Sequence, residues 1–215
     1  AFWNAPLDDA EHAVHACRAA LAMRARLKEL NEAWRAEAEA AGRKYIPIRA
    51  GVGLNTGPCC VGNMGSEMRF DYSVLGDDVN LASRLEGQSK SYGVDVVVGP
   101  RTREAAAGFA ALELDLIRVK GKTVPVRIHA LLGDEALAGR EEFRELASRH
   151  AGLLGAYRSQ RWEEAAALLA ECRTRAEALG LGLGKLYGLY EERLSACRRE
   201  PPGEGWDGVF TATSK

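Results

Sequence analysis

The stretch FDYSVLGDDVNLASR, residues 70–84, decides the fold of this chain. It reads as a strand, a sharp turn at Gly76 and a helix capped by Asp77 or Asp78. Asn80 and Arg84 are four residues apart, so they share one face of that helix and reach one ligand together. The Arg guanidinium is always charged and binds phosphate oxygens in a bidentate manner. Asn both donates and accepts hydrogen bonds, as binding of a sugar hydroxyl or ring oxygen requires. The stretch therefore predicts a nucleotide site.

Extended to residues 48–87, the sequence IRAGVGLNTGPCCVGNMGSEMRFDYSVLGDDVNLASRLEG resembles the second half of a class III nucleotidyl cyclase domain. The resemblance runs from Ala1 to about Leu132. In that family the helical Asn orients the ribose, and the helical Arg stabilises charge developing on phosphate as the 3′-oxygen attacks. The resemblance assigns these catalytic roles to Asn80 and Arg84. Without it, Asn80 would be expected to cap or pack locally and Arg84 to lie on a solvated face.

The same resemblance implies two further substrate contacts. Ser73, seven residues before Asn80, takes the family position against the purine base. Many adenylyl cyclases carry Asp, Thr or Ser at that position, whereas guanylyl cyclases typically carry Cys. Lys120, within Val119-Lys120-Gly121-Lys122, matches a position that contacts the terminal phosphates; the alternative is an exposed lysine at a hairpin tip. We therefore expect an adenylyl cyclase that converts ATP to cyclic AMP and pyrophosphate, with guanylyl cyclase as an alternative.

A divalent cofactor, Mg²⁺ or Mn²⁺, is also implied by the resemblance, held by two Asp carboxylates. Ala1-Phe2-Trp3-Asn4 opens in apolar residues as though already inside a strand, so we expect the metal ligands and a base-selecting Lys upstream of Ala1. Asp8 with Asp9 and Asp77 with Asp78 stand where helix caps are expected, so we assign no metal ligand within the chain. Because cyclase sites lie between two domains, the resemblance implies a homodimer, and we expect this chain to be inactive alone.

The predicted fold class is α+β: a ferredoxin-like cyclase sandwich, incomplete at its N-terminus, followed by a helical hairpin. We divide the chain into residues 1–132 (cyclase), 133–199 (helical and tetratricopeptide-like) and 200–215 (an extended tail docked by its aromatic residues). In the first part, a long helix should cover the sheet through an apolar stripe made of Ala16, Ala20, Met23, Leu27, Leu30 and Trp34. In the second, stripes from Phe143 to Tyr157 and from Trp162 to Leu179 predict two paired helices, and 183–197 a third.

Composition narrows the function classes. With 29 basic and 30 acidic residues, the net charge of -1 gives no support for a nucleic-acid binder. No apolar run approaches the roughly 18 residues needed to span a bilayer, and five cysteines without paired spacing indicate a reducing compartment.

The helical extension and tail also resemble the end of certain bacterial cyclases with an upstream CHASE-type sensor and membrane helices. That resemblance places the catalytic region in the cytoplasm, with membrane contact only through a region upstream. A different class stays open: a noncatalytic cyclase-like regulatory or dimerisation domain whose helical extension binds protein.

Overall fold

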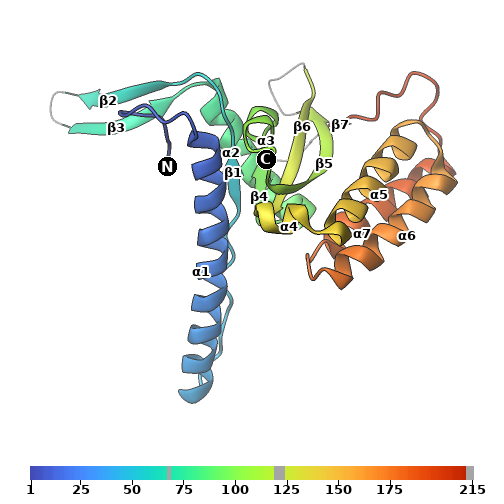
Figure 1. Cartoon of the computed structure of the whole chain (residues 1–215), viewed down its shortest axis with the longest axis horizontal. Helices are drawn as coiled ribbons and strands as arrows, with labels where there is room; N and C mark the ends of the chain where they lie inside the picture. Colours follow the sequence, from blue (N-terminus) through green and yellow to red (C-terminus); the bar gives the residue numbers. More distant parts are fainter. Residues whose placement is uncertain (67–68, 119–123, 212–215) are drawn as a thin grey trace.

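The computed structural model describes residues 1–66, 69–118 and 124–211, which form an α+β fold with helices at the C-terminal end (Figure 1). The helices are α1 (His12–Ala40), α2 (Asp77–Tyr92), α3 (Pro100–Ala105), α4 (Glu135–Gly139), α5 (Glu141–Arg158), α6 (Trp162–Ala178) and α7 (Gly184–Arg199). The strands are β1 (Val52–Leu54), β2 (Cys60–Ser66), β3 (Arg69–Leu75), β4 (Val96–Val98), β5 (Ala110–Arg118), β6 (Val126–Gly133) and β7 (Phe210–Thr211). The predicted strand and helix of the opening motif are confirmed as β3 and α2.

The strands form two sheets. The main sheet has five strands in the order β1-β4-β6-β5-β7, parallel at β1/β4 and β5/β7 and antiparallel between them. The second sheet is the antiparallel hairpin of β2 and β3, which projects from the body of the molecule (Figure 1). Mixed pairing with hairpins and helical crossovers is what the α+β prediction required.

Helices cover both faces of the main sheet, as the contacts of strand β4 show. Its three valines are all buried, but they alternate in direction. Val96 and Val98 pack with the start of α1, whereas Val97 packs with α2 and with the helical extension. The site helix α2 therefore lies on the sheet face that the extension also covers.

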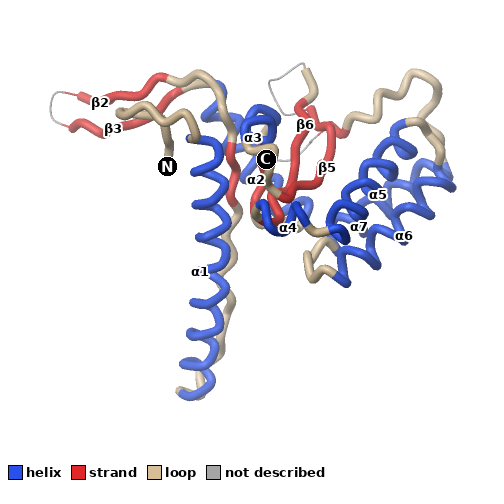
Figure 2. The backbone as a smooth tube through the Cα atoms, in the orientation of Figure 1, coloured by secondary structure: helices blue, strands red, loops and turns tan. Residues whose placement is uncertain are grey.

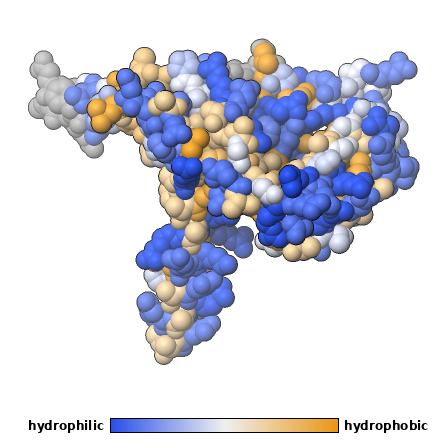
Figure 3. Space-filling model, in the orientation of Figure 1, coloured by the Kyte–Doolittle hydropathy of each residue, from blue (hydrophilic) through white to orange (hydrophobic). Residues whose placement is uncertain are grey.

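The long helix α1 covers the sheet only with its first half. Ala13, Ala16, Cys17 and Ala20 are buried, whereas Met23, in the predicted stripe, is 60% exposed. The C-terminal half projects beyond the sheet, and the extended segment 43–51 runs beside it (Figure 2). Asn31 holds that segment: its amide donates to the Ile48 carbonyl and accepts from the Ile48 amide. An open groove of about 1110 Å³ lies between helix and segment. The projecting end has a mixed surface of hydrophilic and mildly apolar residues (Figure 3).

Both predicted helix caps differ from the structure. Glu11 is the N-cap of α1 and Gly76 that of α2, and neither makes a side-chain cap. Asp9 instead accepts from the Glu11 amide and from His15. Asp77 and Asp78 lie in the first turn of α2, where their charge still favours the helix dipole.

The extension contains the three predicted helices, α5 to α7, with α5 and α6 joined by a short turn. The tail docks through Trp206, whose ring lies 5.1 Å from that of Tyr157 and 5.7 Å from that of Trp162. Its short strand β7, which the sequence pattern did not predict, then pairs in parallel with the end of β5. Across the described part of the chain, no helix is both long and apolar enough to cross a membrane.

Candidate functional site

Helix α2 presents two different faces. Leu81 and Leu85 are buried against the sheet, whereas Asn80 and Arg84 are exposed. Their four-residue spacing places the amide and the guanidinium one turn apart on the same side of the helix. Among the described residues, neither side chain makes a hydrogen bond or an ion pair, so both remain available to a ligand.

The start of α2 is fixed by a loop distant in sequence. Asn55, which follows β1, donates from Nδ2 to the carbonyl of Asp78 at 3.1 Å and to its carboxylate Oδ1 at 3.0 Å. These two bonds tie the end of β1 to the first turn of the site helix. Sequence reasoning missed Asn55, because its partner lies 23 residues away and nothing local marks the pair.

The other predicted site residues have separate positions. Ser73 lies on β3, half-buried and opposite Gly62 of β2, and β3 leads directly through Gly76 into α2. Lys120 lies outside the described residues. The structure thus places Asn80 and Arg84 together, with Ser73 on the adjoining strand.

A cavity of about 490 Å³ borders the other side of the same helix. Val79 and Ala82 of α2 line it, together with Trp3 and with Asn55 and Thr56 of the loop after β1. Asn80 and Arg84 do not line this cavity, so it is separate from their exposed face.

A divalent metal ion does not fit the side chains described. Within residues 1–66, 69–118 and 124–211, no three Asp, Glu, His or Cys side chains come together as a ligand set. Asp9 is engaged by His15, and Asp78 by Asn55. Among the described residues, neither Asp pair therefore gathers the further ligands that a metal site needs.

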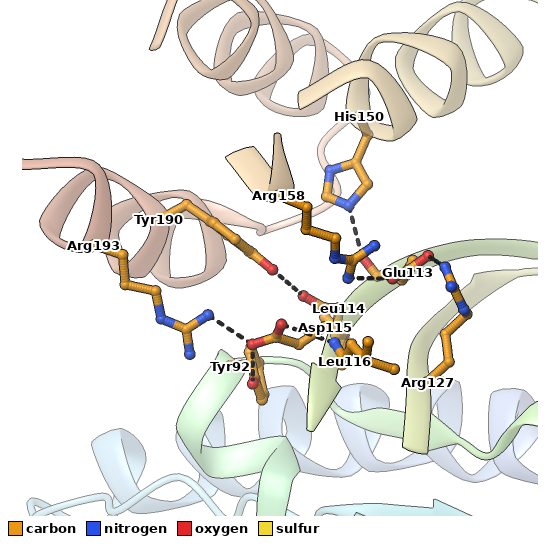
Figure 4. Close-up of polar contacts among 10 residues, drawn as sticks. All are labelled: Tyr92, Glu113, Leu114, Asp115, Leu116, Arg127, His150, Arg158, Tyr190 and Arg193. Atoms are coloured by element: carbon orange, nitrogen blue, oxygen red, sulfur yellow. Dashed lines mark hydrogen bonds and ion pairs between the residues drawn. The ribbon is translucent and has the colours of Figure 1, made fainter. Parts of the chain in front are cut away.

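Contacts at the other end of α2 were also missed by sequence reasoning. The Tyr92 hydroxyl donates to Asp115 of β5 at 2.7 Å, and Arg193 of α7 pairs with the same carboxylate at 2.6 Å (Figure 4). Burial, followed by the nearby Asp115 charge, raises the pKa of Tyr92 well above its ordinary value, so its hydroxyl stays protonated and donates. No pattern links residues 92, 115 and 193 before the fold is known.

Comparison with known proteins identifies the fold. Residues 3–133 match the adenylate and guanylate cyclase catalytic domain family. Adenylate cyclase 1 of Rhizobium meliloti is 38% identical over 135 residues, 62% of this chain and 19% of that protein. An adenylate cyclase of Anabaena cylindrica is 31% identical over 119 residues, 53% of this chain and 23% of that protein. The crystal structure of the adenylyl cyclase CyaB from P. aeruginosa superposes with a TM-score of 0.53 at 32% identity, covering 62% of this chain and 65% of that one.

The chain belongs to the class III adenylate and guanylate cyclase catalytic domain family. It spans about a fifth of the two curated relatives named above, so the match concerns the catalytic domain rather than the whole of those proteins.

Proposed function

We propose that this chain supplies the ribose- and phosphate-binding half of an adenylyl cyclase site, which converts ATP to 3′,5′-cyclic AMP and pyrophosphate. The observation that carries the proposal is the exposed pair on α2, Asn80 and Arg84, in a chain of the cyclase family. Adenylate cyclases among the relatives support ATP as the nucleotide.

The reaction forms a bond between the ribose 3′-oxygen and the α-phosphorus. The 3′-hydroxyl loses its proton, the bond from the α-phosphorus to the bridging oxygen breaks, and pyrophosphate leaves. Asn80 would orient the ribose so that the 3′-oxygen faces the phosphorus. Arg84 would stabilise the negative charge that develops on the phosphoryl oxygens. Ser73 would contact the purine base, and Lys120 the terminal phosphates.

A homodimer is part of the proposal, because sites of the cyclase family lie between two domains and Asn80 and Arg84 would supply only one side of such a site. The β2–β3 hairpin supports it by extending away from the main sheet (Figure 1). On it, Tyr72 is 49% and Leu75 60% exposed. Large apolar side chains on a projecting hairpin suit contact with a partner chain.

A second candidate is a noncatalytic cyclase-like domain that regulates or dimerises a partner. The lack of a metal ligand set among the described residues favours it. The two functions differ in one requirement, since only the enzyme needs two metal-binding carboxylates in the assembled site.

The deciding experiment measures cyclic nucleotide formation from ATP and from GTP with Mn²⁺, using this chain and a form extended upstream of Ala1. We expect the chain alone to be inactive and the extended form to produce cyclic AMP. An extended form that carries two metal-binding Asp residues and makes neither cyclic nucleotide would disprove the proposed cyclase activity. Production of cyclic GMP in preference to cyclic AMP would replace ATP by GTP as the substrate.

A further inference from the structure

The C-terminal end of α2 is joined to the helical extension at two points. At the first, Tyr92 and Arg193 share the carboxylate of Asp115. At the second, the ammonium of Lys185, in the first turn of α7, donates to the carbonyl of Lys90 at 2.5 Å. That carbonyl belongs to the last turn of α2, where a positive charge also favours the helix dipole.

The approach of the two helices is close. Gly93 ends α2 with φ of +70°, and a Cβ added there would lie 2.5 Å from Cβ of Lys185. Only glycine allows this left-handed turn and this separation together. The start of α7 is thus packed directly on the end of the site helix.

A β-bulge brings Asp115 to the junction. Glu113 pairs with His129 and Asp115 with Ile128, so Leu114 is an additional residue in β5. In a regular strand, consecutive side chains point to opposite faces of the sheet, so one of two consecutive residues would be less buried. Here Leu114 and Asp115 are both buried. The bulge therefore turns a carboxylate toward α2 and α7, where Arg193 neutralises it.

The tail covers the same ion pair. The Arg193 guanidinium lies 4.1 Å from the centre of the Phe210 ring and 5.3 Å from that of Tyr190. The Tyr190 hydroxyl donates to the Leu114 carbonyl at 2.7 Å, which fixes α7 to the bulge (Figure 4). Burial opposes the charge of Arg193, but Asp115 outweighs it and raises the pKa of the guanidinium, so the pair stays ionised.

We propose that the helical extension holds the site helix in register, with Arg193 and Lys185 acting as positioning residues for Asn80 and Arg84. This inference rests on the proposed function, since it concerns the same two side chains. The extension fixes the C-terminal end of α2, as Asn55 fixes the N-terminal end. Held at both ends, the helix presents its exposed pair in a single orientation, which transition-state stabilisation requires.

The test compares two double variants of the full chain. Tyr92→Phe with Lys185→Met removes two hydrogen bonds from the end of α2 while keeping most of the side-chain volume. Arg173→Met with Arg175→Met is the control, because it removes ion pairs from α6 to Glu191 and Glu145 without touching α2. Hydrogen exchange of the α2 amides should rise about tenfold in the first variant and stay unchanged in the control. Unchanged exchange in the first variant, or an equal rise in both, would overturn the inference.

Activity provides a readout that a merely structural role would not move. In the active form, the first variant should lower kcat about tenfold and leave KM for ATP within about twofold, because the positioned groups act in the transition state. Should the first variant not fold, Arg193→Met with Asp115→Asn replaces the ion pair by neutral groups and should give the same exchange and kcat changes. Failure of the proposed function is distinct: the unmodified protein would then make no cyclic nucleotide at all.

Discussion

At the scale of single residues, the proposed site depends on Asn80 and Arg84, whose side chains make no hydrogen bond or ion pair among the described residues. Arg84 is exposed and makes no ion pair among the described residues, although the chain forms many Arg–carboxylate pairs elsewhere. A guanidinium without an ion pair contributes little to the stability of the fold. On a helix that is fixed at both ends, it is available to bind an anionic ligand. This is the property that the proposed phosphate contact requires.

Replacement of Arg84 by Ala should lower kcat by about 10²–10³-fold with a smaller change in KM, because its charge acts on the transition state. Arg101→Ala is the matched control, since Arg101 is an exposed arginine on α3, the next helix along the chain, and should keep full activity. Both variants should unfold at the temperature of the unmodified protein. A rise in KM alone for Arg84→Ala would show that the residue contributes only to ground-state binding.

Ser73 should influence which base is accepted. Because guanylyl cyclases of this family typically carry Cys there, Ser73→Cys should raise the ratio of GTP to ATP turnover by roughly tenfold. Competition between the two nucleotides measures that ratio directly. Ser91→Cys, at an exposed serine on α2, is the control for an added thiol. An unchanged ratio would remove Ser73 from the base contact.

The sequence predicted the relative positions of candidate site residues only where local spacing carried the information. The shared helix face of Asn80 and Arg84 could be predicted, because a four-residue step on a helix fixes their relation. Asn55 and Asp115 could not, because each acts on a residue more than 20 positions away. Asp115 was further concealed by the bulge, which breaks the alternation used to assign buried and exposed positions.

At the scale of secondary-structure elements, β1 and α2 pack unusually close together. A Cβ at Gly53 would lie 2.1 Å from the Ala82 carbonyl oxygen and 2.4 Å from the Glu86 amide nitrogen. Both atoms belong to the backbone of α2, so no side-chain movement could relieve the clash. The position of the site helix therefore depends on the absence of a side chain on β1.

Gly53→Ala should destabilise the chain by about 3 kcal/mol, because it forces α2 away from the sheet. Gly87→Ala, on α2 itself, is the matched control, because nothing lies within 4 Å of its added Cβ. The higher helix propensity of Ala should stabilise the folded chain by about 0.5–1 kcal/mol. Urea unfolding measures both changes. Equal stability of the two variants would contradict the close contact.

Elements with regular periodicity were predicted well, whereas their extents and packing were not. The apolar stripe predicted the helix α1 correctly. The residues at the C-terminal end of the stripe do not reach the sheet, because the helix of 29 residues is far longer than the neighbouring strands. The two-residue strand β7 has too few residues to produce any pattern, and its pairing with β5 arises only from the docked tail.

At the scale of the whole molecule, the cyclase-like part and the extension share one hydrophobic core. Leu81 and Leu85 of α2, Leu114 of β5 and Leu186 of α7 belong to a single buried cluster. We therefore expect the two parts to unfold together in one transition rather than as separate domains. Two well-resolved thermal transitions would contradict that expectation.

Two histidines, the half-buried His129 and the buried His150, should make the stability of the fold depend on pH. Burial lowers the pKa of His129 from 6.5 to about 4, against the smaller opposing effect of Glu113 and with Arg103 and Arg127 reinforcing it. His150, bonded to the Glu113 carbonyl, also has its pKa lowered by burial. In the unfolded chain both would titrate near 6.5. The unfolded state thus binds more protons below that value, and folding loses stability as the pH falls from about 6.5 toward 4.

Urea midpoints measured at pH 7.5, 6 and 4.5 should therefore decrease in that order. Replacing His129 by Gln should flatten the decrease, because one of the two groups that titrate only on unfolding is removed. At pH 7.5 both histidines are neutral in the folded and the unfolded chain, so any difference between variant and unmodified protein there measures lost packing alone. A variant whose midpoint falls as steeply as that of the unmodified protein would assign the pH dependence to other groups. The first of these to test is Glu113, because its pKa is raised by burial but lowered overall by Arg158 and Arg127, which places its own loss of stability at lower pH.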